Sequence, residues 1–369
     1  MYLALFACLI LFALLSRKNV KKDLKYTIAM LIMTVVLCLR YGQGTDYFSY
    51  NDLYTMYSTF ELAITNPYNH YMEILYRLIC AFFNTLGFSF AGFVAVVSLF
   101  NMLMLNRFLK RYSQNPIFSL LLFYPTFYLT YFFSIIRQAI VLSVFLGYMV
   151  ELLMKKKVAK YFLCSLIMAL IHSSSVVLIA IPILLKFNLK KIYFIIACAA
   201  PIGLIMATTP IAKLFAYIPF VGTQILNYIN QSISVIALLE RVISFTIIWY
   251  LYKSRKPGLE QDCIDHFMKL YAFGLAIYFI FMPFPLISSR LMLFFKVFEV
   301  ILIPNMINIK KSVHLILSVV VLSMTVIMYF KNIGSYIDQG LYNDSVNVFN
   351  YPYFNIFDKQ EIWKYRRYS

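Results

Sequence analysis

Long apolar runs recur along this chain and limit what it can fold into. Several reach about 18–20 residues, the length that an α-helix needs to cross a hydrocarbon layer roughly 30 Å thick. Of the 369 residues, 62% are hydrophobic and 13% are charged. A soluble protein of this length cannot bury so much apolar surface in one core, because roughly half or more of its residues face water. The sequence therefore predicts an all-α, polytopic membrane protein.

The apolar runs predict about ten transmembrane helices. These are residues 2–16, 26–40, 88–106, 117–133, 135–154, 190–208, 235–253, 264–282, 290–309 and 312–330. Two further apolar segments, 71–87 and 161–185, do not fit the alternation of inside and outside. We expect each to enter the membrane and return, or to form a broken pair of short helices beside a cavity.

Basic residues set the predicted orientation. The net charge is +18, from 33 Lys+Arg against 15 Asp+Glu, and the basic residues mostly flank apolar runs. That pattern is typical of the positive-inside bias and argues against a nucleic-acid partner. Segments 41–70 and 209–234 and the tail 331–369 are therefore predicted to be external. We find no repeat or linker, so residues 1–369 are expected to form one polytopic domain.

Arginines on the predicted outer side are the main candidates for a binding site. Ionisable groups in a membrane are costly and often functional. Arginine is planar, always charged, and binds phosphate or carboxylate through two parallel hydrogen bonds. A cluster of arginines at the lipid–water boundary suits a diphosphate whose lipid tail stays in the bilayer. The candidates are Arg40, Arg137, Arg241 and Arg290.

Two residues are candidates for the catalytic base. Asp46 follows a glycine-rich turn, and His172 lies in the middle of segment 161–185. A carboxylate or an imidazole can deprotonate an acceptor hydroxyl. The alternatives are that Asp46 orients Arg40 or caps the next helix, and that His172 is a core histidine bonded to a neighbouring serine.

Some of the charges have structural explanations as well. Glu73 and Arg77 lie four residues apart, and Glu240 is adjacent to Arg241, so each pair fits either an intramembrane ion pair or a binding site. Arg40 fits either a site or a side chain that snorkels to the headgroups. Arg137 and Arg290 have no acidic residue within four positions, which favours a functional role. The candidate substrate-binding residues are Tyr47, Glu73, Arg77 and Gln138.

Motifs for nucleotide and metal chemistry are missing from the sequence. There is no phosphate-binding loop, nucleophile elbow, HExxH motif or DxD-like pair, and no CxxC pair among the six cysteines. This argues against an ATP-driven transporter, a serine hydrolase, a zinc protease and a metal-dependent nucleotide-sugar transferase. We expect no metal and no cofactor.

Four segments carry a resemblance to a known family. Residues 40–50 (RYGQGTDYFSY), 135–142 (IIRQAIVL), 172–174 (HSS) and 288–295 (SSRLMLFF) resemble the EpsG-like, Wzy-type polysaccharide polymerases of bacteria, in order and spacing. The first segment is the most specific. By this match, the positions carried over are Arg40, Asp46, Arg137 and Arg290.

The resemblance implies a multi-pass enzyme of the bacterial cytoplasmic membrane whose active site faces outward. Such glycosyltransferases join oligosaccharide repeat units carried on undecaprenyl diphosphate, without metal or nucleotide, in exopolysaccharide or O-antigen biosynthesis. The expected partners are the lipid-linked oligosaccharide, the bilayer, a flippase and a chain-length regulator.

Three other functions stay open. A lipid-linked oligosaccharide flippase or transporter needs similar arginines along a path open to both faces, and the cytoplasmic half carries few intramembrane charges. A membrane O-acyltransferase would use His172 as its base, but no acidic residue lies near that histidine in the sequence. A ligase that moves finished polymer onto a lipid acceptor is mechanistically close and is not separable by sequence.

Overall fold

The structure, a computed structural model, describes residues 1–16, 23–66, 72–208, 234–255, 261–308 and 312–366. These residues form helices and no β-strand, apart from isolated bridges between Arg40 and Asn355 and between Tyr342 and Arg366. Within these described ranges, six helices are long and apolar enough to cross a membrane, and further apolar helices are shorter. The prediction of an all-α, polytopic membrane protein is confirmed.

The chain forms two compact units, which we describe separately. Unit 1 contains Met1–Ser173 and Val319–Ser369, and unit 2 contains Ser174–Ser318. Helix α18 (Ser312–Gln339) begins in unit 2 and continues into unit 1. The single-domain organisation stays a prediction.

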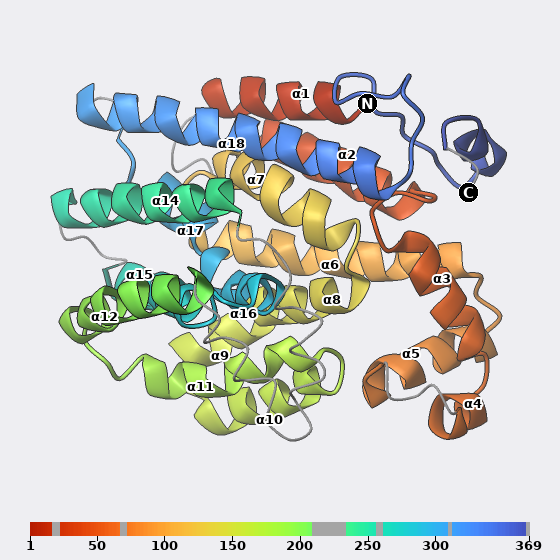
Figure 1. The fold of residues 1–369 in the computed structure, drawn as a ribbon, viewed down its shortest axis with the longest axis horizontal. Helices are drawn as coiled ribbons and strands as arrows, with labels where there is room; N and C mark the ends of the chain where they lie inside the picture. Colours follow the sequence, from red (N-terminus) through yellow and green to blue (C-terminus); the bar gives the residue numbers. More distant parts are fainter. Residues whose placement is uncertain (17–22, 67–71, 209–233, 256–260, 309–311, 367–369) are drawn as a thin grey trace. The chain divides into compact units, whose positions relative to one another are not determined.

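Unit 1 is built from apolar helices with short helices between them (Figure 1). They are α1 (Tyr2–Leu14), α2 (Leu24–Leu39), α3 (Tyr47–Met56), α4 (Phe60–Thr65), α5 (Ile74–Thr85), α6 (Phe90–Tyr112), α7 (Pro116–Phe123), α8 (Ile136–Val144), α9 (Val150–Met154) and α10 (Val158–Ala169). Helix α1 packs against α7, and α2 packs against α6.

Local sequence explains where several of these helices begin. The side chains of Asp23, Ser89 and Asn115 each accept a hydrogen bond from a backbone N–H in the first turn of α2, α6 and α7. Pro116 occupies the first position of α7, where no intrahelical N–H is needed. These caps satisfy donors that would otherwise be left unpaired at the helix ends.

Irregular helical stretches follow α7 and α8. Residues Tyr124–Phe132 and Phe145–Met149 are π-helical, and the chain breaks its helix between Phe132 and Ile136. Irregular backbone frees carbonyl groups, which need partners in an apolar medium. Two are satisfied from α18: Asn332 donates to the Pro125 carbonyl at 2.6 Å, and Tyr336 donates to the Leu129 carbonyl.

These bonds explain why α18 continues past residue 330. The polar residues after 330 predicted the start of an external tail, but α18 continues to Gln339. Its polar side chains face carbonyls of the π-helical stretch, so they do not end the helix. Helix α18 therefore extends past the predicted span 312–330, the rest of the tail contains a 3₁₀ helix at Lys359–Lys364, and the external location of 331–369 stays a prediction. In the other external segments, 41–70 contains α3 and α4, and 209–233 lies outside the described residues.

Segments 71–87 and 161–185, which do not fit the alternation of inside and outside, both contain short helices. Segment 161–185 forms α10, a 3₁₀ turn at Ser173–Val176 and α11 (Val177–Leu184), as the prediction of a broken pair requires. Segment 71–87 forms one helix, α5, of 12 residues. At 1.5 Å of rise per residue, α5 is too short to cross a bilayer about 30 Å thick.

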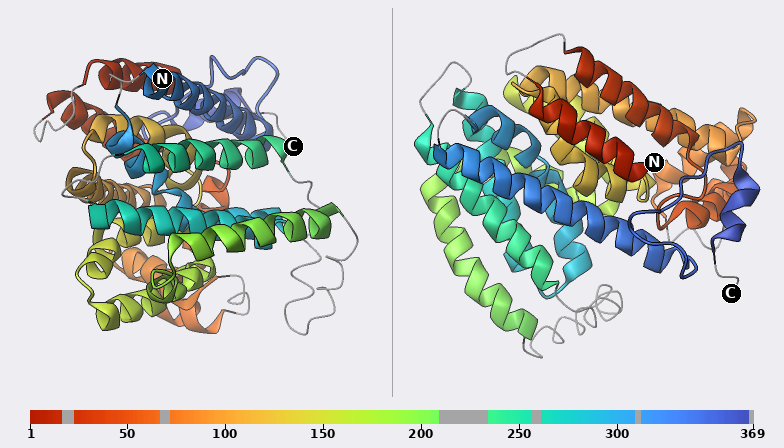
Figure 2. Two further views of the ribbon diagram at one scale, coloured as in Figure 1. Left: turned by 90° about the vertical axis from the view of Figure 1, so that its left-hand side faces the viewer. Right: turned by 90° about the horizontal axis from the view of Figure 1, so that it is seen from above.

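Unit 2 contains α11, α12 (Leu189–Thr208), α14 (Val235–Ser254), α15 (Gln261–Ile280), α16 (Pro285–Lys296), α17 (Glu299–Met306) and the start of α18. Helix α15 packs on α12 and α14 (Figure 2). Gly203 of α12 lies against the backbone of Phe279, and Phe187 contacts Phe273, so α12 and α15 run in parallel. Their N-terminal ends therefore lie on the same side of unit 2.

The predicted span 290–309 is two helices. Helix α16 begins earlier than expected, at Pro285, and a turn at residues 297–298 separates it from α17. Neither glycine nor proline marks this turn, so hydropathy alone does not predict it.

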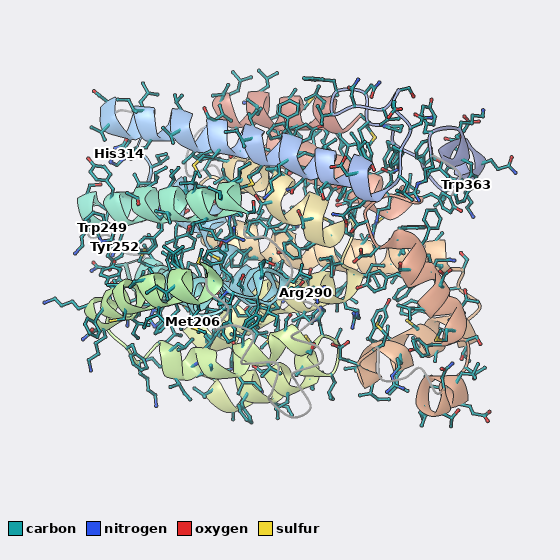
Figure 3. All side chains as sticks on the ribbon, in the orientation of Figure 1. Met206, Trp249, Tyr252, Arg290, His314 and Trp363 are labelled. Carbon is teal, nitrogen blue, oxygen red and sulfur yellow. The ribbon has the colours of Figure 1, made fainter. Side chains whose placement is uncertain are left out.

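Basic and aromatic residues gather at one end of unit 2. Tyr252 donates to Asp265 at 2.9 Å, Arg255 pairs with Asp265, and Ser254 lies 3.4 Å from His314. Figure 3 labels Trp249, Tyr252 and His314 at this end of α14 and α18. The end of α14 thus adjoins the starts of α15 and α18, as the positive-inside pattern requires. The orientation in a membrane stays a prediction.

Candidate functional site

Arg137 and Glu73 form an ion pair in unit 1. Arg137 lies in the first turn of α8, and Glu73 immediately precedes α5. The side chains are 16% and 20% exposed, so the pair is shielded yet reachable. Sequence proximity had paired Glu73 with Arg77. Instead, Arg77 is buried and donates to the Ala63 carbonyl.

The break in segment 161–185 contributes to the same cluster. The backbone N–H of Ser173 donates to the second carboxylate oxygen of Glu73 at 2.7 Å. His172, which precedes Ser173, is buried and lies close enough to Glu73 for an electrostatic interaction. The structure thus brings together Glu73, Arg137 and His172, which the sequence singled out separately.

Aromatic rings surround the Arg137 guanidinium. It lies 6.0 Å from the ring centre of Tyr50 and 5.8 Å from that of Tyr76, and its Nε is 3.4 Å from the Tyr50 hydroxyl. Burial raises the pKa of Tyr50, although the Arg137 charge opposes this shift. The phenol therefore stays neutral. Gln138, the next residue of α8, is fully buried.

Asp46 lies one helical turn from Tyr50, at the start of α3. The Tyr50 N–H donates to the Asp46 carbonyl at 2.9 Å, and the Thr45 hydroxyl donates to the Asp46 carboxylate at 2.8 Å. The Asp46 side chain does not cap α3, contrary to one alternative from the sequence. Helix α3 therefore carries Asp46 and the Tyr50 hydroxyl that contacts Arg137.

The glycine-rich turn before Asp46 packs against the helix break. Gly44 has φ +94°, and a Cβ there would meet the Phe133 carbonyl oxygen at 2.5 Å. The Thr45 N–H donates to the Ser134 hydroxyl at 3.2 Å. Only glycine allows this approach. The glycine-rich turn is therefore held against Ser134, which lies three residues before Arg137.

Arg40 is buried at the other end of the turn. It is 2% exposed and donates from one nitrogen to the Leu37 carbonyl at 2.6 Å and the Ser98 hydroxyl at 2.7 Å. Its guanidinium lies 5.3 Å from the Phe133 ring centre. Arg40 does not snorkel to a surface. Nearby Tyr47 is also buried, which raises its pKa to about 12.

The C-terminal tail covers the glycine-rich turn. Tyr41 donates its N–H to the Phe354 carbonyl at 2.9 Å, Ile356 donates to the Leu39 carbonyl at 3.0 Å, and Arg366 donates to the Gly42 carbonyl at 3.2 Å. The buried side chain of Ile362 occupies the space where a Cβ of Gly42 would lie. The turn is thus held from both sides, by the helix break and by the tail.

Unit 2 contains a buried charge cluster that the sequence reasoning missed. Lys296 Nζ lies 2.8 Å from Glu240 and 2.5 Å from Glu299. All three side chains are at most 10% exposed, and the Tyr271 hydroxyl lies 3.5 Å from Glu299. The i,i+3 spacing of Lys296 and Glu299 inside an apolar run was the available signal.

Arg241 lies at the edge of this cluster. It donates to the Ala237 carbonyl at 2.7 Å, and its guanidinium lies 4.4 Å from the Tyr278 ring centre. Its distance to Glu240 is 3.9 Å, so Lys296 is the closer partner of that carboxylate. The adjacent-pair interpretation of Glu240 and Arg241 describes only the weaker contact.

Arg290 lies in the second turn of α16, where it is partly exposed (Figure 3). The helix begins at Pro285, so Arg290 does not open it, contrary to the sequence prediction. In the part of the chain that the structure describes, no three His, Cys, Asp or Glu side chains gather as a metal site would require. The roles of the individual residues stay predictions.

Apolar helices with charge clusters held among them define a multi-pass membrane protein. The chain belongs to the EpsG family, whose model matches residues 23–354. This finding confirms the resemblance and makes the chain, at a coarse level, a glycosyltransferase-like protein of exopolysaccharide polymerisation. Comparisons with curated proteins and with solved structures gave no match.

Proposed function

We propose that this protein is a polysaccharide polymerase that joins oligosaccharide repeat units carried on undecaprenyl diphosphate. The reaction takes place at the outer face of a bacterial cytoplasmic membrane and needs neither metal nor nucleotide. A flippase that delivers the units and a chain-length regulator are the proposed partners.

One observation carries the proposal: helix α3 links a carboxylate to a held arginine. The Arg137 guanidinium contacts the Tyr50 hydroxyl at 3.4 Å, and Tyr50 is one turn from Asp46. Glu73 fixes Arg137 from the other side. Arginine has five N–H donors, so these contacts leave donors for a diphosphate. A fixed cation near a carboxylate is what glycosyl transfer from a lipid diphosphate requires.

In the proposed reaction, a hydroxyl oxygen of one lipid-linked unit attacks the anomeric carbon of the other. A C–O glycosidic bond forms as the bond from that carbon to the diphosphate oxygen breaks, and the diphosphate leaves with the electron pair. The hydroxyl proton passes to the base. Asp46 suits this role, because its carboxylate keeps lone pairs beyond the Thr45 hydrogen bond. Glu73 suits a positioning role, since Arg137 and Ser173 occupy its oxygens.

The remaining candidates divide into two roles. Arg137, in unit 1, is proposed to bind the diphosphate and to stabilise the charge that develops on it. Arg241 and Arg290, in unit 2, are candidates for binding a diphosphate within that unit. Arg40 is proposed to act through the glycine-rich turn, because its side chain is buried and its Nη1 donates to Leu37 and Ser98. His172 is the second candidate for the base.

The test is deletion of the gene in its native strain, with gel analysis of surface polysaccharide. We expect single-repeat chains in place of polymer, and restoration of polymer by the plasmid-borne gene. Loss of all external repeat units would instead indicate a flippase. Intact polymer without acetyl groups would indicate an acyltransferase, and either result would overturn the proposal.

A second test uses purified protein and lipid-linked repeat units in the presence of a chelator and without nucleotide. Polymer and released undecaprenyl diphosphate are expected. A requirement for a divalent ion that persists through chelation and add-back controls would contradict the metal-independent reaction.

A further inference from the structure

Trp363 forms an exposed aromatic platform in the C-terminal tail. Its ring stacks on Phe48 of α3, with ring centres 5.7 Å apart and an angle of 29° between the planes. Arg366 lies 4.8 Å from the Phe48 ring centre, so Phe48 is held in place. Trp363 nevertheless remains 43% exposed. A large ring that is supported from within and open outward is available to a ligand with an apolar face.

A polar depression lies beside this platform. It has a volume of about 370 Å³, which is within the range of small-ligand sites. Its lining includes the carboxylates of Asp338 and Asp344, the amide of Asn343 and the ring of Tyr342. Both carboxylates are exposed. These groups offer several hydrogen-bond acceptors and donors around one open space.

Short contacts join the platform and the depression. Arg366 lies 5.3 Å from the Tyr342 ring centre as well as over Phe48. The Asn343 N–H donates to the Tyr365 carbonyl at 2.9 Å. The depression therefore borders directly on the residues that follow Trp363.

We propose that the Trp363 ring and the Asp338–Asp344 depression form one binding site for an oligosaccharide, the sugar portion of the substrate or of the growing chain. The proposal rests on the proposed function and assigns it a sugar subsite outside the reacting centre. Sugar rings present C–H faces that pack on aromatic rings, and hydroxyl groups that bond to carboxylates and amides. The two parts of the site match these two features.

The lining charges favour a sugar over a membrane surface. Two carboxylates repel the phosphates of lipid headgroups, whereas they accept hydrogen bonds from sugar hydroxyls. Interfacial tryptophans sit at the level of the lipid headgroups, where these carboxylates would face the phosphates. The connection to the glycine-rich turn, through Arg366 and Gly42, puts a bound sugar next to the turn that carries Asp46.

The chain's two tryptophans provide a direct test. In a Trp249→Phe variant, Trp363 is the single tryptophan reporter. The purified protein is titrated with oligosaccharides released by mild hydrolysis of the native strain's own exopolysaccharide. We expect a saturable change in Trp363 fluorescence. Adding Asp338→Asn and Asp344→Asn to this variant should weaken binding about tenfold. The matched Trp363→Phe variant, which keeps Trp249, is expected to show no response.

A polymer assay and a lipid assay complete the test. Cells carrying Trp363→Ala at normal abundance are expected to make shorter polymer, because the growing chain is released more often. A saturable response from neither tryptophan reporter, together with polymer of normal length from Trp363→Ala, would overturn the sugar site and leave the proposed polymerase standing. Quenching of Trp363 by brominated phosphatidylcholine vesicles, with no response to sugar, would assign the platform to the membrane. Failure of the wild-type gene to restore polymer would count against the polymerase itself.

Discussion

The Glu73 carboxylate pairs with the Arg137 guanidinium across 64 residues of sequence. Each residue was a candidate on its own, and the pair joins α5 to α8 within unit 1. The Ser173 amide binds the other oxygen of Glu73. Three segments that are far apart in the sequence therefore converge on one carboxylate.

Glu73→Gln should impair polymer formation more than it impairs folding. The amide keeps the shape and can still accept from Ser173, but it loses the charge that fixes Arg137. We expect a drop of about tenfold or more in polymer yield at normal protein abundance. Glu61→Gln, at an exposed position in α4, is the matched control and should behave like wild type. Equal polymer from both variants would remove Glu73 from the site.

Polymer formation should require an arginine at position 290. If Arg290 binds a diphosphate, a lysine in its place keeps the charge but loses the two-point contact. Removing a donor to a developing charge typically costs about a hundred- to a thousandfold in rate. We expect Arg290→Ala to abolish polymer and Arg290→Lys to be severely impaired, with both proteins inserted at normal abundance. Polymer of normal length and amount from the lysine variant would exclude this role.

Lys296 should be needed for stability because it lies between Glu240 and Glu299. Lys296→Met leaves two buried carboxylates without their cation, a change that typically costs about 3–5 kcal/mol. We expect a clear fall in the detergent melting temperature. Adding Glu240→Gln and Glu299→Gln should recover most of it. Lys364→Met, at an exposed pair with Glu361, is the control and should leave the melting temperature unchanged. A melting temperature for Lys296→Met as high as that of the wild type would refute the stabilising role of the cluster.

Gly44→Ala should disrupt the site through the backbone. A Cβ would meet the Phe133 carbonyl oxygen at 2.5 Å, so the turn or the helix break must shift. Gly87 has a similar positive φ of +79°, but a Cβ there meets nothing within 4 Å. We expect Gly44→Ala to lose most polymer and Gly87→Ala to retain most of it. The comparison separates the steric clash from the general cost of alanine at positive φ. Similar losses in both variants would contradict the close-approach argument.

The predicted topology can be tested with single cysteines in a cysteine-free background. Ser58→Cys and Asn343→Cys should react with a membrane-impermeant thiol reagent in intact spheroplasts. Lys156→Cys, in a basic cluster, should react only after lysis. The reverse pattern would invert the orientation.

Hydropathy was sufficient to predict the helical class and the apolar segments, because crossing a bilayer demands long apolar helices. It failed where tertiary contacts decide. In the sequence, Asn332 and Tyr336 resemble tail residues, because their carbonyl partners on the π-helical stretch are 207 positions away. The partner of Arg137 was hidden for the same reason. Lys296 was missed because its partner Glu240 lies on a different helix, far away in the sequence. The glycine-rich turn was found early because positive φ and close approach restrict the residue type locally.

The order of synthesis has a consequence for the tail that closes over the glycine-rich turn. Arg366 and Gly42, which bond to each other, are 324 residues apart, and Tyr353 bonds to the Val36 carbonyl across 317. The ribosome therefore makes the first helices long before their covering segment exists. Until α18 and the tail have been made, the turn lacks the partners that the tail provides. Chains that stall or are cut before residue 353 should thus insert in the membrane yet never assemble a working site, which delays activity until the tail has been made.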